Sequence, residues 1–294
     1  MGFLLEPFRY EFFTRGLVAA TMVGGLCGLV GVYIVLRRMS YIGHGLSHAV
    51  FGGAVASYVM GVSFYVGAGI WGFAAALLIN GLSRRRQIGA DAAIGIITTA
   101  SFAFGVALIS QYRRFTRNFD AALFGNILGV TNQDLVVVAA VSLVTVVLIF
   151  LLYKQLLFTT FDPEVAPIYG VRSGLTETVF SLMLAGTIIA SMQVMGVTLI
   201  AAAIVIPAIV ARLLTDSFST MLWLATLVGA LCGLFGIYLS YFMDVSSGAT
   251  IVLVASALFV VVYGAVSLRR RLSGRAARQE AAAGRARSIA GLFD

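Results

Sequence analysis

The chain has 294 residues, of which 60% are hydrophobic and 11% are charged. Soluble globular chains carry about 25% charged residues, so this composition excludes a water-soluble fold. The formal net charge of +8 does not indicate a nucleic-acid partner, because seven arginines lie in the tail that follows the last apolar segment.

The amino-terminal segment, residues 1–15, is rich in aromatic side chains and carries charges of both signs. It lacks the succession of basic, apolar and small residues that is typical of a cleaved signal segment. We interpret it as an interfacial amphipathic segment that lies against the lipid membrane.

Uncharged stretches that are long enough for a membrane span of about 20 residues follow along the chain. They are residues 16–36, 64–83, 92–112, 135–153, 178–211, 217–243 and 245–268. A further stretch, residues 39–87 before its arginine run, has two histidines as its only ionisable groups and adds one span. The 34 residues of 178–211 are interpreted as two short spans. We therefore predict an all-α integral membrane protein with eight or nine transmembrane helices in one domain, residues 16–268.

The basic residues between the spans indicate the topology. The residues that fall on the same side as the tail, when the amino terminus lies outside, are Arg37, Arg38, Arg84–Arg86, Lys154 and Arg212. Positive residues accumulate on the cytoplasmic side, so we place the arginine-rich tail, residues 269–294, in the cytoplasm. The loop at residues 111–120 has three arginines on the opposite side and is the exception.

Two glycine-rich segments, residues 23–33 and 228–238, are identical at eight of eleven positions. Both carry glycines four residues apart, a spacing that lets helices pack closely in lipid. The match is either an ancestral internal repeat or the same packing solution reached twice. Cys27 and Cys232 lie within these segments and are interpreted as small packing residues.

The chain has two histidines, His44 and His48, near the start of an apolar span. On a helix this spacing places both on one face. Neutral imidazole binds zinc, copper, iron and nickel, and ionisable groups at membrane depth usually face a cavity or pathway. We interpret the pair as candidate metal ligands; the alternative is that they bond across helices or reach the interface.

Residues 159–174 form the longest polar interruption between spans. Asp162 is expected to cap a helix that begins at Pro163, with Glu164 in its first turn and Pro167 ending it early. The alternative is an ordinary capped surface loop. We place this loop in the cytoplasm.

A break at residues 193–196 divides the uncharged stretch 178–211, and a proline interrupts its second half. Broken helices at membrane depth must line protein or a cavity. Gln193, Gly196 and Pro207 are therefore a second candidate for a pathway.

Catalytic and motor sequences are missing from the chain. No glycine-rich phosphate loop with a following lysine occurs, and Lys154 is the only lysine. The carboxylates near the spans lie at their predicted ends, where capping is the usual role. We predict a transport subunit without its own ATPase site, not an enzyme, with no permanently bound cofactor. A self-contained secondary metal transporter or channel is the alternative, and the lack of a mid-span carboxylate argues against it.

Short motifs spread over nearly the whole chain are similar to those of one transporter family. They are LEPF at 5–8, LRRMS at 36–40, LSHA at 46–49, AIGI at 93–96, LFGNILG at 123–129, FDPE at 161–164, VMGV at 194–197, IPA at 206–208, ARLL at 211–214, LSYF at 239–242 and SGATI at 247–251. In order and spacing they resemble the ABC-3 family of permeases, which import zinc, manganese or iron.

The resemblance implies a type II ABC importer permease-like fold in the cytoplasmic (inner) membrane. It also implies an ATP-binding subunit, an extracytoplasmic metal-binding protein and a second permease copy as partners, with a divalent metal ion as substrate. The expected ATPase-coupling residues are Phe161, Asp162, Pro163, Glu164, Tyr169 and Arg172.

The resemblance also bears on the choice of metal. His48 matches the family histidine, whereas His44 stands where the family has aspartate. Because carboxylate favours manganese relative to imidazole, this departure favours zinc over manganese or iron.

Overall fold

The structure is a computed structural model, and it describes residues 6–83, 88–112, 123–125 and 129–290, with side chains through residue 272. In this part of the chain the regular elements are all helices. They are η1 (Glu6–Arg9), α2 (Glu11–Leu36), α3 (Ser40–Val59), α4 (Phe64–Ser83), α5 (Ala90–Gln111), α7 (Asn132–Leu151), α8 (Tyr153–Phe161), α9 (Ser173–Met195), α10 (Ile200–Leu214), α11 (Phe218–Met243) and α12 (Ser247–Ala290).

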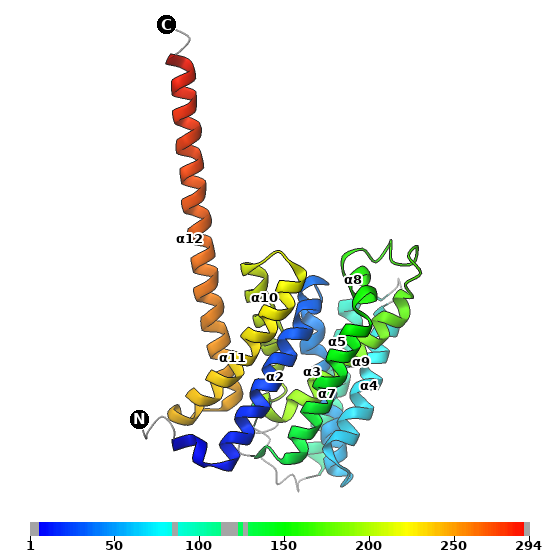
Figure 1. The fold of residues 1–294 in the computed structure, drawn as a ribbon. Coiled ribbons are helices and arrows are strands. Elements are labelled where there is room, and N and C mark those ends of the chain that lie inside the picture. The colour runs from blue at the N-terminus through cyan, green and yellow to red at the C-terminus, as the bar shows by residue number, and fades with distance from the viewer. Residues whose placement is uncertain (1–5, 84–87, 113–122, 126–128, 291–294) are drawn as a thin grey trace.

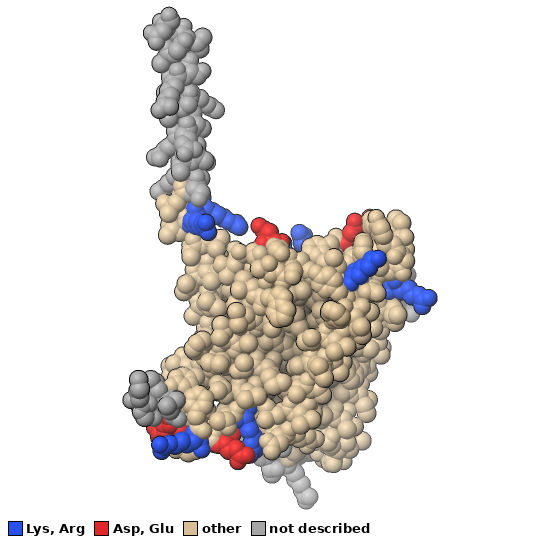
Figure 2. Space-filling model, viewed as in Figure 1, with Lys and Arg blue, Asp and Glu red and all other residues tan. Residues whose placement is uncertain are grey.

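Length and apolar composition identify the membrane-crossing helices. Seven of the described helices qualify: α2, α4, α5, α7, α9, α11 and the first part of α12. On the face drawn in Figure 2, the middle of the bundle shows no charged side chains, and the charged groups gather at its two ends. The predicted all-α membrane architecture is thereby confirmed, whereas seven qualifying helices do not by themselves establish eight or nine crossings.

Two predicted spans fall outside this group for identifiable physical reasons. Helix α10 is apolar but has only 15 residues. Helix α3 is rich in glycine, serine and histidine, and it packs against α4, α5 and α9. Because most of its side chains contact protein, α3 does not need the apolar surface that lipid demands.

The two similar glycine-rich segments pack against each other. A Cβ placed on Gly24 of α2 would meet the carbonyl oxygen of Gly229 in α11, and one on Gly28 would meet that of Ala225. Residues four positions later in α2 contact residues four positions earlier in α11, so the two helices are antiparallel. The repeated motif therefore provides both surfaces of one close helix contact, as small residues do in lipid.

The ends of the chain lie at opposite ends of the bundle. Figure 1 shows α2 starting near the amino terminus at the lower end, whereas α8 and the departing part of α12 lie at the upper end. This arrangement groups Lys154 of α8 with Arg269 and Arg270 of α12. Arg84–Arg86 and most of the loop 111–120 lie outside the described residues.

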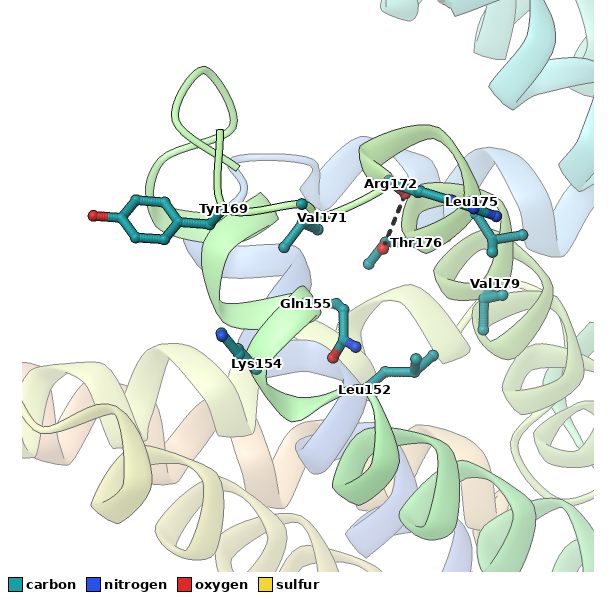
Figure 3. Close-up of a pocket in the computed structure, with 10 residues that line it drawn as sticks. Leu152, Lys154, Gln155, Tyr169, Val171, Arg172, Leu175, Thr176 and Val179 are labelled. Atoms are coloured by element: carbon teal, nitrogen blue, oxygen red, sulfur yellow. Dashed lines mark hydrogen bonds between the residues drawn. The ribbon is translucent and has the colours of Figure 1, made fainter. Parts of the chain in front are cut away.

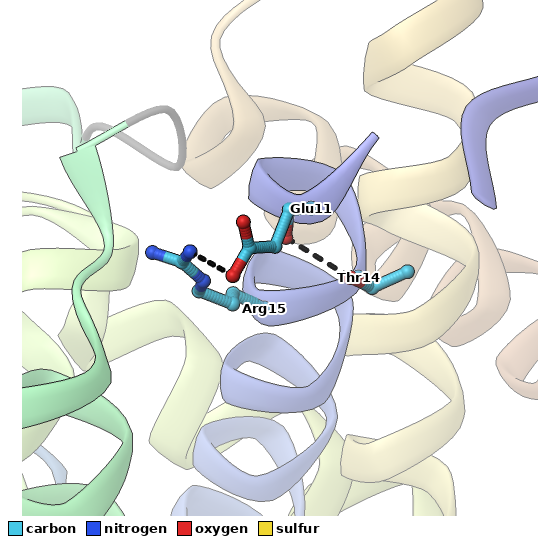
Figure 4. A network of polar contacts seen from close by, with 3 residues as sticks. All are labelled: Glu11, Thr14 and Arg15. Atoms are coloured by element: carbon cyan, nitrogen blue, oxygen red, sulfur yellow. Dashed lines mark hydrogen bonds and ion pairs between the residues drawn. The ribbon is translucent and has the colours of Figure 1, made fainter. Parts of the chain in front are cut away.

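Helix α2 begins before the expected membrane boundary. Arg15 pairs with Glu11 one turn earlier, and the Thr14 hydroxyl donates to the Glu11 carbonyl at 2.9 Å (Figure 4). Residues 11–15 are thus the first turn of a long helix. The Glu11 side chain is 77% exposed, so this ion pair contributes only about 0.3–0.5 kcal/mol. The division of the chain at residue 15 stays a prediction.

Candidate metal pathway and cytoplasmic docking loop

Helix α3 brings the two histidines together on one face. The ring centroids of His44 and His48 are 4.6 Å apart, with an angle of 70° between the planes. His44 is exposed and His48 half-buried. The His48 ring meets Phe102 of α5 edge to face at a centroid distance of 5.1 Å. The pairing expected from the four-residue spacing is confirmed.

Glycines on the neighbouring face of α3 seat it on α5. A Cβ on Gly45 would collide with the Ile94 side chain, and one on Gly52 would collide with the Ser101 backbone. The close contact fixes the rotation of α3 about its axis. The same rotation leaves His44 on the open side of the helix.

Two imidazoles supply two nitrogen ligands and no more. Among the described residues, no group of three or more His, Cys, Asp or Glu side chains lies close enough to hold a metal ion. A closed structural zinc site uses four protein ligands. The pair is therefore suited to an ion that keeps other ligands, which is what a transported substrate needs. Its metal-binding role stays a prediction.

The predicted helix break packs against residues 123–125. Helix α9 ends at Met195, Gly196 has φ +76, and α10 begins at Ile200. A Cβ on Gly196 would collide with the carbonyl group of Leu123, and the hydroxyl of Thr198 donates to that same carbonyl at 2.8 Å. Glycine is needed here for its positive φ and for the close backbone contact.

Helix α10, which follows the break and holds the buried Pro207, packs against the histidine helix α3. A Cβ on Gly43 would lie 3.9 Å from Cδ1 of Ile204 in α10. Gly43 is the residue before His44, so α10 passes directly beside the start of the histidine face. Gln193 is half-buried near the end of α9. The position of the break is confirmed, and its role in a pathway stays a prediction.

The loop at residues 159–174 differs from the expected short helix. Helix α8 precedes Asp162, and residues 163–170 form turns. The expected cap is present, since the Val165 amide donates to Asp162 Oδ1 at 3.2 Å. The prediction of a helix from Pro163 was wrong because Pro167 cannot donate to the Pro163 carbonyl four residues earlier.

All six residues expected to contact an ATPase are exposed; they are Phe161, Asp162, Pro163, Glu164, Tyr169 and Arg172. Phe161 is 58% and Tyr169 62% exposed, and the neighbouring Ile168 is 82% exposed. Large apolar side chains gathered on a polar loop mark an interaction surface. Their contact with an ATPase stays a prediction.

A cavity of about 300 Å³ lies between α8 and the start of α9 (Figure 3). Lys154 and Gln155 line it from α8, and Tyr169 and Arg172 line it from the loop. The loop backbone is tied to α9, because the Thr176 hydroxyl donates to the Arg172 carbonyl at 3.2 Å. The loop also contacts α8 beside this cavity, since the rings of Tyr169 and Phe158 stack at a centroid distance of 5.0 Å.

The sequence interpretation missed one residue at this end, Arg37. Its Nε donates to the Thr160 hydroxyl at 3.0 Å, and a terminal nitrogen donates to the Thr159 hydroxyl at 2.9 Å. The guanidinium also lies 4.4 Å from the ring centroid of Phe180. These contacts join α2, α8 and α9 at one side chain.

Arg37 keeps its charge in this setting. Burial lowers the pKa of its guanidinium to about 10, and the nearby Glu177 opposes that shift. At neutral pH the side chain is therefore a cation. The sequence signal was available as an arginine pair directly after a span, which we interpreted only as a topology marker.

Known proteins resemble this chain over most of its length. It is 39% identical over 261 residues to the manganese transport system membrane protein MntC of Halalkalibacterium halodurans, covering 89% of both chains. It is 35% identical over 268 residues to the "Probable iron transport system membrane protein" of Haemophilus influenzae, covering 91% of this chain and 98% of that one.

A solved structure and a family match agree with these relatives. The structure of PsaBC from Streptococcus pneumoniae in complex with Fab superposes with a TM-score of 0.80 and 32% identity, covering 88% of this chain and 94% of that one. Residues 9–265 match the ABC 3 transport family. The chain therefore belongs to the ABC 3 transport family, as its motifs indicate.

Proposed function

We propose that this chain is the permease subunit of an ATP-binding cassette importer that moves a divalent transition metal ion across the cytoplasmic membrane. The observation that carries the proposal is the His44–His48 pair, with ring centroids 4.6 Å apart on one face of a helix inside a family permease. Ionisable groups at membrane depth are costly and usually mark an ion pathway.

The identity of the metal rests on two different arguments. The relatives described above are named for manganese and iron transport, and they give the zinc preference no support. Two imidazoles without a carboxylate, in contrast, favour zinc on ligand chemistry. We place manganese and iron first on the strength of the relatives and keep zinc as the competing expectation.

Nine membrane crossings are the topology that we propose. Adding α3 and α10 to the seven qualifying helices puts the two ends of the chain on opposite sides of the membrane. The opposite placement of the two ends in Figure 1 supports this count. The end that carries α8 and the start of the tail is then cytoplasmic.

The proposed partners follow from surfaces that one copy leaves open. The exposed loop 161–172 faces the cytoplasm in this topology and is the proposed docking site for an ATP-binding subunit. The opposite end is where an extracytoplasmic metal-binding protein would deliver the ion. A second permease copy would bring two further imidazoles to the exposed His44 side of α3. ATP is hydrolysed by the partner subunit, and the metal ion is a substrate and not a resident cofactor.

A self-contained secondary transporter or channel is not favoured. The chain belongs to an ABC family, and its described carboxylates lie at or near helix ends. Asp134 illustrates their role: its Oδ2 accepts from the Thr131 amide at 2.7 Å, closing a capping box at the start of α7. Such a group stabilises a helix end, and its carboxylate is already used there.

The test is metal accumulation in cells that express the permease with its ATP-binding subunit. We expect uptake of one metal to be lost in His44→Ala and in His48→Ala at equal membrane abundance. Ser40→Ala, at the exposed first residue of α3, is the matched control and should leave uptake unchanged. Undiminished uptake in both histidine variants would remove the pair from the pathway.

A further inference from the structure

We propose that Arg37 is a positioning residue that transmits movement of the cytoplasmic loop to α3, the helix that carries the histidine pair. The inference rests on the proposed function, because it presupposes a motor subunit bound at loop 161–172. It adds a role for a residue that contacts neither the motor surface nor the histidines.

The first step is the link from the loop to Arg37. The loop follows directly from α8, whose last turn contains Thr159 and Thr160. Arg37 donates to both hydroxyls, at 2.9 and 3.0 Å. Two donors from one planar guanidinium on adjacent hydroxyls fix the orientation of α8 relative to the end of α2, which a single contact would not do.

The two hydroxyls are held in place to accept these bonds. Thr159 Oγ1 donates to the Gln155 carbonyl at 2.9 Å, and Thr160 Oγ1 donates to the Leu156 carbonyl at 2.6 Å. Each hydroxyl proton is thus used within α8, and the oxygen presents its lone pairs to Arg37. A displacement of the last turn of α8 therefore acts on the guanidinium.

The guanidinium is also held from the side of α9. It lies over the ring of Phe180, which is 2% exposed, and it is attracted by Glu177. A cation over an aromatic face is stabilised by the ring quadrupole. Lysine would keep the charge but would lose the planar, two-donor geometry, so the two side chains are not interchangeable here.

The second step is the link from Arg37 to α3. The amide of Arg38 donates to the Val35 carbonyl at 3.2 Å, and that of Met39 donates to the Ile34 carbonyl at 3.0 Å. This pair of bonds is a Schellman motif, with Arg38 in the left-handed conformation at φ 56. The turn from α2 to α3 is therefore a hydrogen-bonded connector and not a loose loop.

Helix α3 continues from this connector without a gap. The Ile42 amide donates to the Met39 carbonyl at 3.0 Å, and α3 begins at Ser40. His44 lies one helical turn further on, about 6 Å along the axis at 1.5 Å per residue. A rotation or shift of the connector thus moves the first histidine of the pair.

The consequence is a specific kind of defect when Arg37 is altered. Helix α8 also contacts α7 and α9, so the loop keeps its support and its exposed docking surface. What is lost is the connection between the loop and α3. The altered permease should bind its motor and hydrolyse ATP, yet move less metal for each ATP consumed.

The experiment measures metal uptake per ATP hydrolysed by the complete permease–ATPase complex in proteoliposomes. We expect Arg37→Lys and Arg37→Gln to lower this ratio about tenfold or more, because glutamine removes the charge and neither side chain has the planar fork that holds both hydroxyls. The double variant Thr159→Val, Thr160→Val removes the acceptors with almost no change of shape and should lower the ratio in the same way. Arg269→Lys, at an exposed position of α12 outside this connection, is the matched control and should keep the native ratio.

An unchanged ratio in assembled complexes of Arg37→Lys and of the double threonine variant would overturn the proposal. So would equal loss of ATP hydrolysis and uptake, because that result assigns Arg37 a purely structural role. Failure of the proposed function has a different signature, since the native chain itself would then show no ATP-driven uptake.

Discussion

The close contact between α2 and α11 permits a prediction whose size follows from the structure. Replacing Gly28 by alanine places a Cβ 2.8 Å from the carbonyl carbon of Ala225, whereas ordinary contacts of this kind begin at 3.4 Å. The shortfall exceeds about 0.6 Å, because the carbonyl oxygen of Ala225 lies closer still than its carbon. It must be met by separating two helix backbones, since no flexible side chain can yield. Overpacking of this kind costs about 1–3 kcal/mol.

The matched control is Gly81→Ala in α4, where the added Cβ would meet no atom within 4 Å. That change should stabilise α4 by about 0.5–1 kcal/mol through helix propensity alone. Thermal unfolding of the detergent-solubilised permease measures both variants. We expect Gly28→Ala to unfold several degrees below the native chain and Gly81→Ala at or above it. Equal unfolding temperatures for the two variants would refute the packing argument.

Three further predictions concern the helix break, the capping box and the docking loop. Gly196→Ala should lower the free energy of unfolding by about 1–3 kcal/mol in the same assay, because it adds a steric collision to a positive φ. Gly170 has φ +75 but open space around it, so Gly170→Ala should lower the free energy of unfolding less. Asp134→Asn should also lower the unfolding temperature, since one carboxylate oxygen caps α7 and the other accepts from the Tyr65 hydroxyl at 2.5 Å. The expected loss in the free energy of unfolding is about 1–3 kcal/mol, and an unchanged unfolding temperature would contradict this. Tyr169→Ala should weaken binding of the ATP-binding subunit by about tenfold in a pull-down titration. The control is Phe150→Ala, which should not weaken binding, because Phe150 is 81% exposed on the apolar surface of α7. Equal effects of the two changes would remove the loop as the docking surface.

Much of the helical architecture could be predicted because lipid imposes a simple rule on the sequence. Backbone groups at membrane depth must be satisfied internally, so a long uncharged stretch has to be helical. The end of α9 could be predicted as well, because the uncharged stretch 178–211 was interpreted as two short spans divided at residues 193–196. The sequence was less informative at the loop, where we placed a helix after Asp162 although the helix precedes it. Pro163 and Pro167, four residues apart, already argued against a helix between them.

Contacts between distant segments could not be predicted from local patterns. The similarity of residues 23–33 and 228–238 indicated close packing but did not show that each segment packs against the other. Arg37 and Thr160 are more than a hundred residues apart, and an arginine after a span is ordinary in sequence terms. The histidine pair was predictable because its two members share one helix. The proposed metal site would need ligands beyond these two imidazoles, and among the described residues no third His, Cys, Asp or Glu lies close enough to join them.

ATP-driven uptake of manganese, iron and zinc into proteoliposomes tests the central claim most directly. The permease would be reconstituted with its ATP-binding subunit, as the native chain, as His44→Ala and as His48→Ala, each confirmed to form the complex. We expect ATP-dependent uptake of a divalent transition metal by the native chain and its loss in both variants. Uptake without ATP, or equal uptake by all three proteins, would contradict it.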